Sequence, residues 1–188
     1  MRKKLMACGL LFLGITAPVL SQNNQKETYP NVLFETGKAF FKEKIYEGSI
    51  QSLKAFVEES EEESLVAEAE FMMLYAATEL NKEGVTEEIL DYMHNYPVTV
   101  HSNRLNYLLA SSYYMKGAYT EAIKWFGKTD IDQLSSDEQD CFFYRSAYSY
   151  LQQKEYKIAS NLFKLLKQNS LPYRKDARYY DSYIDYCE

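Results

Sequence analysis

The stretch that most constrains this chain occurs twice. Residues 113–126 have the sequence YYMKGAYTEAIKWF, and 37 positions later residues 150–163 have the sequence YLQQKEYKIASNLF, with Tyr, Tyr, Ala and Phe at the same places. A related stretch, FFKEKIYEGSIQSL, lies at 40–53, and a degenerate one, ATELNKEGVTEEIL, lies at 77–90, so the register advances by 37, 36 and 37 residues. Self-similarity at a fixed period of this length indicates a fold built from repeated units.

Each unit is predicted to be a pair of helices. Leu109, Ala110 and Tyr113 are spaced as one face of a helix, and a second such face follows after Gly117, where the chain must turn. Small residues at 110, 122, 147 and 159 should let the paired helices approach closely. Because 188 residues contain only 7 Gly and 4 Pro, the chain lacks the turn residues of an all-β fold, and we expect it to be all-α.

Two capping boxes are predicted from the pattern Ser-x-x-Glu. Ser135 and Glu138 would begin the first helix of the fourth unit, and Ser60 and Glu63 that of the second.

Residues 1–21 have the layout of a secretory signal peptide. A basic start is followed by an uncharged apolar run that ends before Pro18 and is too short to span a membrane comfortably. We expect cleavage near residue 21, a flexible segment at 22–29, and a mature protein that is periplasmic or outer-membrane-associated without being inserted in the membrane. The residues before Cys8 superficially resemble a lipidation motif, but such a motif follows the apolar run, whereas Cys8 lies at its start.

The charge of the mature chain excludes some partners. Of the 21 basic side chains three lie in the leader, which leaves 18 against 27 acidic ones. This surplus of acid disfavours nucleic acid, which is bound through clustered Lys and Arg, and anionic lipid.

The sequence offers little for catalysis. His94 and His101 flank Pro97 without a nearby Cys or an HExxH sequence, so we interpret them as surface loop histidines and expect no metal site. No Gly-rich phosphate loop or GxSxG elbow is present, so no cofactor and no catalytic residue are predicted. The acidic run at 58–64 lacks the spaced ligands and the Gly of a calcium loop, and we interpret it as a solvated loop that leads into a helix.

The repeated residues resemble the tetratricopeptide repeat, a helical hairpin of about 34 residues with large apolar, Gly or Ala, Tyr, Ala and Phe positions. The first, third and fourth units carry the resemblance most clearly. The residues are Leu33, Gly37, Phe40, Tyr46, Ser49, Leu53 and Phe56; Leu109, Ala110, Tyr113, Gly117, Tyr119, Ala122 and Phe126; and Phe143, Ala147, Tyr150, Tyr156, Ala159, Phe163, Leu166 and Pro172.

The second unit departs most from the pattern, since it loses the Tyr and the Ala of its second helix. It keeps Met73, Leu74, Ala77, Leu90, Met93 and Pro97.

The resemblance covers residues 30–188. The long period also resembles the repeats of bacterial cell-envelope proteins, among them the outer-membrane assembly lipoproteins and the Tol-Pal-associated periplasmic factor. The expected units are 30–66, 67–102, 103–139 and 140–175, with a final helix at 176–188.

The resemblance implies a right-handed α-solenoid of about four hairpins plus the final helix, with the first helices lining a concave face. That face would bind a peptide segment or a protein partner and would not be an enzyme site. Its aromatic side chains suit peptide recognition, and Lys38, Lys42 and Arg104 would favour an acidic segment. The residues predicted to line it are Phe34, Lys38, Phe41, Phe71, Tyr75, Arg104, Tyr107, Tyr114, Tyr144 and Tyr148.

Three alternatives stay open. The aromatic residues could pack between successive units and contact no ligand. The final helix has no second helix after it, so the chain could be the N-terminal part of a longer repeat protein whose functional domain lies beyond Glu188. A thiol-dependent activity at Cys141 is the third alternative.

Cys141 and Cys187 are not expected to form a disulfide within the chain. On neighbouring first helices they would differ in height by about nine residues, or roughly 14 Å, whereas a disulfide needs Cα atoms within about 7 Å. Pairing of Cys187 with another chain stays open.

Overall fold

A computed structural model describes residues 23–169 and 172–187. Within these ranges the chain forms nine α-helices, one short 3-10 helix (η1) and no strand, so the predicted all-α class is confirmed. The predicted signal peptide lies outside the described residues. The elements are α1 (Asn23–Lys42), α2 (Tyr46–Glu59), α3 (Glu63–Glu79), α4 (Val85–Asn95), α5 (Ser102–Met115), α6 (Tyr119–Phe126), η1 (Ile131–Gln133), α7 (Ser136–Gln152), α8 (Tyr156–Asn169) and α9 (Arg174–Cys187).

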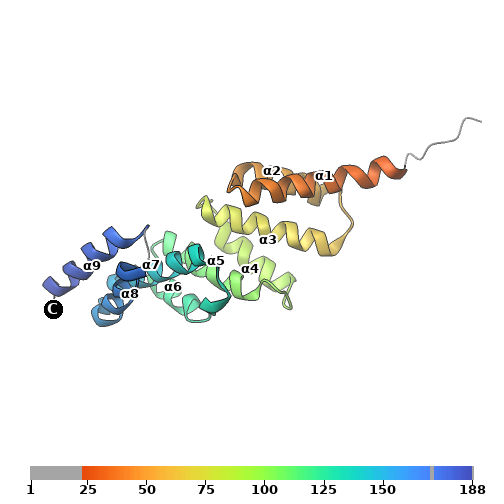
Figure 1. The fold of residues 1–188 in the computed structure, drawn as a ribbon. Helices are drawn as coiled ribbons and strands as arrows, with labels where there is room; N and C mark the ends of the chain where they lie inside the picture. Colours follow the sequence, from red (N-terminus) through yellow and green to blue (C-terminus); the bar gives the residue numbers. More distant parts are fainter. Residues whose placement is uncertain (1–22, 170–171, 188) are drawn as a thin grey trace, which may run out of the picture.

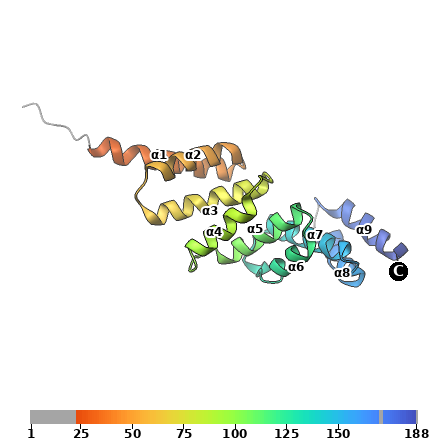
Figure 2. The ribbon, with the colours of Figure 1, turned by 180° about the vertical axis from the view of Figure 1, so that it is seen from behind.

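The helices follow one another in an elongated array, from α1 at one end to α9 at the other (Figures 1 and 2). Each helix contacts the next along the chain, and the odd-numbered helices also touch in succession, α1 with α3, α3 with α5 and α5 with α7. Among the described residues no comparable contact joins α2 to α4 or α4 to α6. The odd-numbered helices therefore share one side of the array.

Two clusters of buried apolar side chains hold this array together. The larger cluster runs from Phe34 in α1 to Leu134 just before α7, and the smaller one runs from Ala147 in α7 to Ile184 in α9. Both are built mainly from helices that are neighbours in sequence. Such local packing is typical of helical repeat proteins.

The first helix of each pair begins ahead of the predicted unit start. The predicted starts are residues 30, 67, 103, 140 and 176. The observed helices begin at Asn23, Glu63, Ser102, Ser136 and Arg174.

Small residues allow three of the hairpins to close tightly, as predicted. The hydroxyl of Ser49 in α2 donates to the carbonyl of Gly37 in α1 at 2.9 Å. A Cβ atom on Gly37 would lie 2.5 Å from Cγ of Leu53, so only glycine fits this contact. The corresponding small residues of the later hairpins, Ala110, Ala122, Ala147 and Ala159, are completely buried.

The second hairpin is more open than the others. Leu74 stands where the other first helices have Gly37, Ala110 and Ala147, and α3 and α4 touch each other less extensively than the helices of any other hairpin. A leucine at the point of closest approach holds two helix axes further apart than glycine or alanine does. The departure seen in the sequence of this unit thus has a structural consequence.

The predicted buried face of α4 was partly wrong. Leu90, expected to be apolar core, is 39% exposed, and Met93 is half-buried. The turn before α4 has five residues where the turns before α2, α6 and α8 have three, which rotates the helix relative to the expected register. The residues that α4 buries are Val85, Thr86, Ile89 and Tyr92.

A left-handed backbone residue recurs with the period of the repeat. Lys44, Asn81, Gly117 and Lys154 all have positive φ, at 58°, 50°, 74° and 61°. Each lies in the turn between the two helices of a hairpin. At Gly117 no neighbouring atom lies within 4 Å of the place that a Cβ atom would occupy, so its need for glycine comes from the backbone angle and not from crowding.

One of the two predicted capping boxes is confirmed. The Ser135 hydroxyl accepts from the Glu138 backbone N–H at 3.4 Å, and the Glu138 carboxylate accepts from the Ser135 backbone N–H at 2.7 Å. The box at Ser60 was wrong, because α3 begins after Glu62 and no side chain caps it. The Ser60 hydroxyl instead accepts from the Glu62 N–H at 3.2 Å, a local turn within the acidic loop.

No helix within residues 23–169 and 172–187 combines the length and the apolar character needed to cross a membrane.

Candidate functional site

A hollow of about 600 Å³ lies between α1, α3 and α5 and extends to the first turn of α7. We call it the α1–α3–α5 hollow. Five of the ten predicted site residues line it, together with Lys42. Its lining side chains are Glu35, Lys38, Ala39, Phe41, Lys42, Glu68, Phe71, Met72, Tyr75, His101, Arg104, Ser135 and Glu138.

Aromatic rings form one wall of the hollow. Phe41 and Tyr75 meet edge to face with ring centroids 5.1 Å apart, and Tyr46 contacts Phe41 from α2 at 6.0 Å. All three are half-buried. Burial raises the pKa of Tyr75 well above its ordinary value, and the nearby carboxylates of Glu138 and Glu79 raise it further, so this phenol is neutral and can donate a hydrogen bond.

The cations of the hollow differ in how they are paired. Lys38 forms an ion pair with Glu35 at 3.0 Å, and its ammonium group lies 5.1 Å from the centroid of the Phe34 ring. Arg104 is 45% exposed and pairs through Nε with Glu138 at 3.5 Å. Lys42 is exposed and forms no hydrogen bond or ion pair with any described residue. It is therefore the cation most available to a ligand in this part of the chain.

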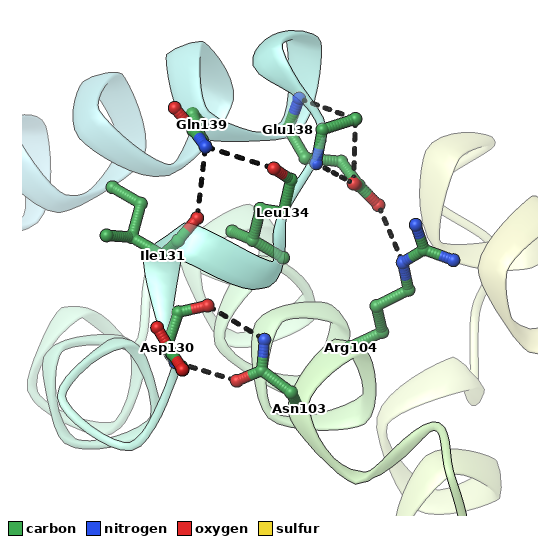
Figure 3. A network of polar contacts seen from close by, with 8 residues as sticks. Asn103, Arg104, Asp130, Ile131, Leu134, Glu138 and Gln139 are labelled. Atoms are coloured by element: carbon green, nitrogen blue, oxygen red, sulfur yellow. Dashed lines mark hydrogen bonds and ion pairs between the residues drawn. The ribbon is translucent and has the colours of Figure 1, made fainter.

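Glu138 is the most buried charged group of the hollow, with its side chain 6% exposed. One carboxylate oxygen accepts from both the backbone N–H and the hydroxyl of Ser135 at 2.7 Å, and the other faces Arg104 (Figure 3). A buried carboxylate is stable only when its oxygens are paired in this way. Glu138 thus ties the start of α7 to α5 and orients the Arg104 guanidinium.

A second set of hydrogen bonds reinforces the same junction (Figure 3). Asn103 in α5 donates to the Asp130 carbonyl at 2.8 Å and accepts from the Asp130 N–H at 2.7 Å. Gln139 in α7 donates to the carbonyls of Ile131 and Leu134 at 3.1 and 3.0 Å. These contacts fix η1 between α5 and α7, next to the ion pair of Arg104 with Glu138.

His101 lines the hollow; it lies in the turn before α5, as predicted, but its prediction as a surface residue was wrong. Its ring stacks on Phe71 with centroids 3.8 Å apart and planes at 3°, and its Nε2 lies 2.7 Å from a Glu68 oxygen. The side chain is only 15% exposed. His94 is exposed, as expected, but it lies in the last turn of α4 and not in a loop.

Three of the predicted site residues belong to the core. Phe34 is buried against Phe56, with ring centroids 4.9 Å apart, and Tyr107 is 1% exposed. Phe71 is also buried and reaches the hollow only beneath His101. The alternative that these aromatic residues pack between helices fits all three of them.

The remaining predicted residues, Tyr114, Tyr144 and Tyr148, lie apart from the hollow in a tyrosine cluster of α5, α7 and α9. Tyr148 contacts Tyr114 at 5.9 Å and Tyr180 at 5.3 Å between ring centroids. Burial is the main cause that raises the pKa of Tyr114 to about 12. The cluster is half-buried, and it continues the aromatic character of the odd-numbered helices towards α9.

Sequence reasoning missed the acidic half of the hollow. Glu68 precedes Phe71 by three residues, so it lies on the same face of α3, and this spacing could have indicated it. Glu138 was assigned only to a cap. Its approach to Arg104 joins residues 34 positions apart and leaves no local signal.

Cys141 is a free, half-buried thiol on α7. Its sulfur lies 3.1 Å from the hydroxyl of Tyr173. Within the described residues no group of three or more His, Cys, Asp or Glu side chains is placed to hold a metal ion.

Comparison with models of known protein families finds no match to this chain, and comparison with curated proteins finds none either.

Proposed function

We propose that this chain is an exported tetratricopeptide-type repeat protein, a right-handed solenoid that holds a segment of a partner protein across its odd-numbered helices. The periodic left-handed turn residues and the succession of contacts among α1, α3, α5 and α7 support the repeat. Signal-directed export would place the protein in the periplasm or at the outer membrane. No nucleic acid, metal or cofactor enters the proposal.

The observation that carries the proposal is the α1–α3–α5 hollow itself. It spans the first helices of three successive units and combines the half-buried Phe41 and Tyr75 rings with the unpaired Lys42. Aromatic side chains contribute a large contact area with few rotatable bonds to immobilise. An open hollow of this kind suits a segment lying across it better than it suits an enclosed reaction.

The charges of the hollow favour an acidic segment. Lys42 is free to pair, and Arg104 uses only Nε towards Glu138, so its terminal nitrogens remain for a ligand carboxylate. Lys38 is exposed, and its surface ion pair with Glu35 contributes little to stability. Lys38 can therefore leave Glu35 and pair with a carboxylate of the ligand. The surrounding acidic residues would repel a segment that lacks such a match.

The experiment is a pull-down from cell-envelope extract with the mature chain as bait. The variant Phe41→Ser with Lys42→Glu removes one ring of the aromatic wall and reverses the charge of the unpaired lysine. The matched control is Ile158→Ser with Lys157→Glu on α8, which changes an exposed apolar and lysine pair away from the hollow. We expect the partner to be retained by the native chain and the control and lost from the hollow variant. Equal retention by all three would place the interface elsewhere.

A further inference from the structure

A second cavity, of about 390 Å³, opens between α2, α3 and α4, and we call it the α2–α3–α4 cavity. Its floor is apolar and includes Ile50, Met73, Leu74 and Ala77. It exists because the second hairpin is held open by Leu74 in place of a glycine or alanine. Leu74 and Ala77 are buried and Ile50 and Met73 are half-buried, so a ligand gains free energy by removing the exposed part of these side chains from water.

The rim of this cavity is acidic. Glu88 and Asp91 are exposed and lie one turn apart on α4, and neither pairs with any described residue. Glu70 lines the cavity from α3. The one lysine among the described lining residues, Lys82, is already engaged with Glu47 at 2.9 Å. The lining therefore carries three carboxylates against one lysine, which leaves it with a net negative charge.

The two hollows occupy opposite faces of α3. Phe71 and Tyr75 face the α1–α3–α5 hollow, whereas Met73 and Ala77 face the α2–α3–α4 cavity. At about 100° per residue these two pairs lie on nearly opposite sides of the helix. The cavity is thus a separate surface, and occupying it does not require displacing anything from the first site.

We propose that the α2–α3–α4 cavity binds a segment of a partner protein that carries an apolar side chain flanked by Lys or Arg. The apolar side chain occupies the floor, and the basic side chains pair with Glu88 and Asp91, whose spacing of one helical turn sets their Cβ atoms about 5–6 Å apart on one face of α4. An acidic segment, which the first site favours, is repelled here. The chain therefore presents two surfaces of opposite charge preference on the two sides of one helix.

The test uses a short fluorescein-labelled peptide of leucine and lysine at helical spacing, with binding measured by fluorescence anisotropy. Glu88→Lys with Asp91→Lys should weaken binding by at least about tenfold, because two attractive contacts become repulsive. The matched control, Glu121→Lys with Asp132→Lys, makes the same change of net charge at exposed residues outside the cavity and should bind like the native chain. All of these residues are exposed, and circular dichroism checks that both variants fold.

Four results would overturn the proposal. They are no binding of the peptide to the native chain, equal weakening by the two charge variants, undiminished binding of a peptide with serine in place of leucine, and tighter binding of a peptide with glutamate in place of lysine. Phe41→Ser with Lys42→Glu should leave peptide binding unchanged. Failure of this proposal can therefore be distinguished from failure of the proposed function of the α1–α3–α5 hollow.

Discussion

The repeat is as clear in single residues of the turns as it is in the helices. Lys44, Asn81, Gly117 and Lys154 share a left-handed backbone at steps of 37, 36 and 37 residues, yet only one of them is glycine. A non-glycine residue in this conformation is strained by roughly 1 kcal/mol. The turns at Lys44 and Lys154 thus carry strain that a glycine would relieve, whereas asparagine, as at Asn81, adopts this conformation more readily.

Lys154→Gly should therefore stabilise the protein by roughly 0.5–1 kcal/mol, and Gly117→Ala should destabilise it by at least about as much. The control is Lys164→Gly, an exposed position in the middle of α8, where glycine should cost about 1 kcal/mol. Urea unfolding of the three variants measures these differences. A loss of stability in Lys154→Gly would contradict the assigned turn.

The buried Tyr92 gives a prediction for alkaline pH. Its hydroxyl donates to the Ala67 carbonyl at 3.0 Å, and burial raises its pKa to about 12 although a hydrogen bond with Thr99 acts in the opposite direction. Because the folded pKa lies above the unfolded value near 10, the stability due to Tyr92 is complete below pH 10 and is lost as the pH rises through 12.

Tyr92→Phe should therefore flatten the fall in unfolding free energy between about pH 10 and 12, by up to about 1.4 kcal/mol per pH unit. At neutral pH it should cost about 1 kcal/mol through the lost hydrogen bond. Denaturant unfolding at several pH values measures both effects. An unchanged alkaline slope would show that this phenol ionises equally well in the folded chain.

At the scale of elements, the two Ser-x-x-Glu sequences make a matched pair. Ser135 caps α7, whereas Ser60 lies in a loop before an uncapped α3. Ser135→Ala should lower stability by about 1 kcal/mol, and Ser60→Ala should change it by less than about half of that. Thermal unfolding of the two variants distinguishes them. Equal losses would contradict the observed start of α3.

The helices themselves were predictable because apolar periodicity and the repeated glycine or alanine positions act within one hairpin. The face of α4 was not, since a longer turn rotates the helix and nothing in the residues of α4 records that rotation. The short α6 and the η1 turn were also not anticipated.

The candidate site was likewise predictable only in part. Lys38, Phe41 and Tyr75 follow from their place on the first helices. The stacking of His101 on Phe71 and the pairing of Glu138 with Arg104 depend on distances between helices that are set only when the units pack. From the sequence alone, the aromatic residues at helical spacing could not be assigned to the core or to the surface.

At the scale of the whole molecule, each helix contacts mainly its neighbours in sequence, so we expect a destabilising substitution to act mainly on the helices around it. Ile184 is completely buried in the smaller cluster, which belongs to α7, α8 and α9. Ile184→Ala should cost about 2–5 kcal/mol. Since each unit contacts mainly its neighbours, the loss should be concentrated at the α9 end.

Hydrogen exchange followed by mass spectrometry measures this distribution. Amide protection should fall in α8 and α9 and stay near its native level in α1 and α2. A uniform fall along the chain would show that the two clusters unfold as one unit.

The most direct measurement of the central claim is site-specific photo-cross-linking in cells that produce the protein. A benzophenone amino acid replaces Phe41 in the α1–α3–α5 hollow or, in a second strain, Ile158 on α8. Mass spectrometry then identifies what each position has captured. We expect a partner-protein adduct at position 41 and none of the same partner at position 158. The same adduct at 158 with none at 41 would contradict this expectation.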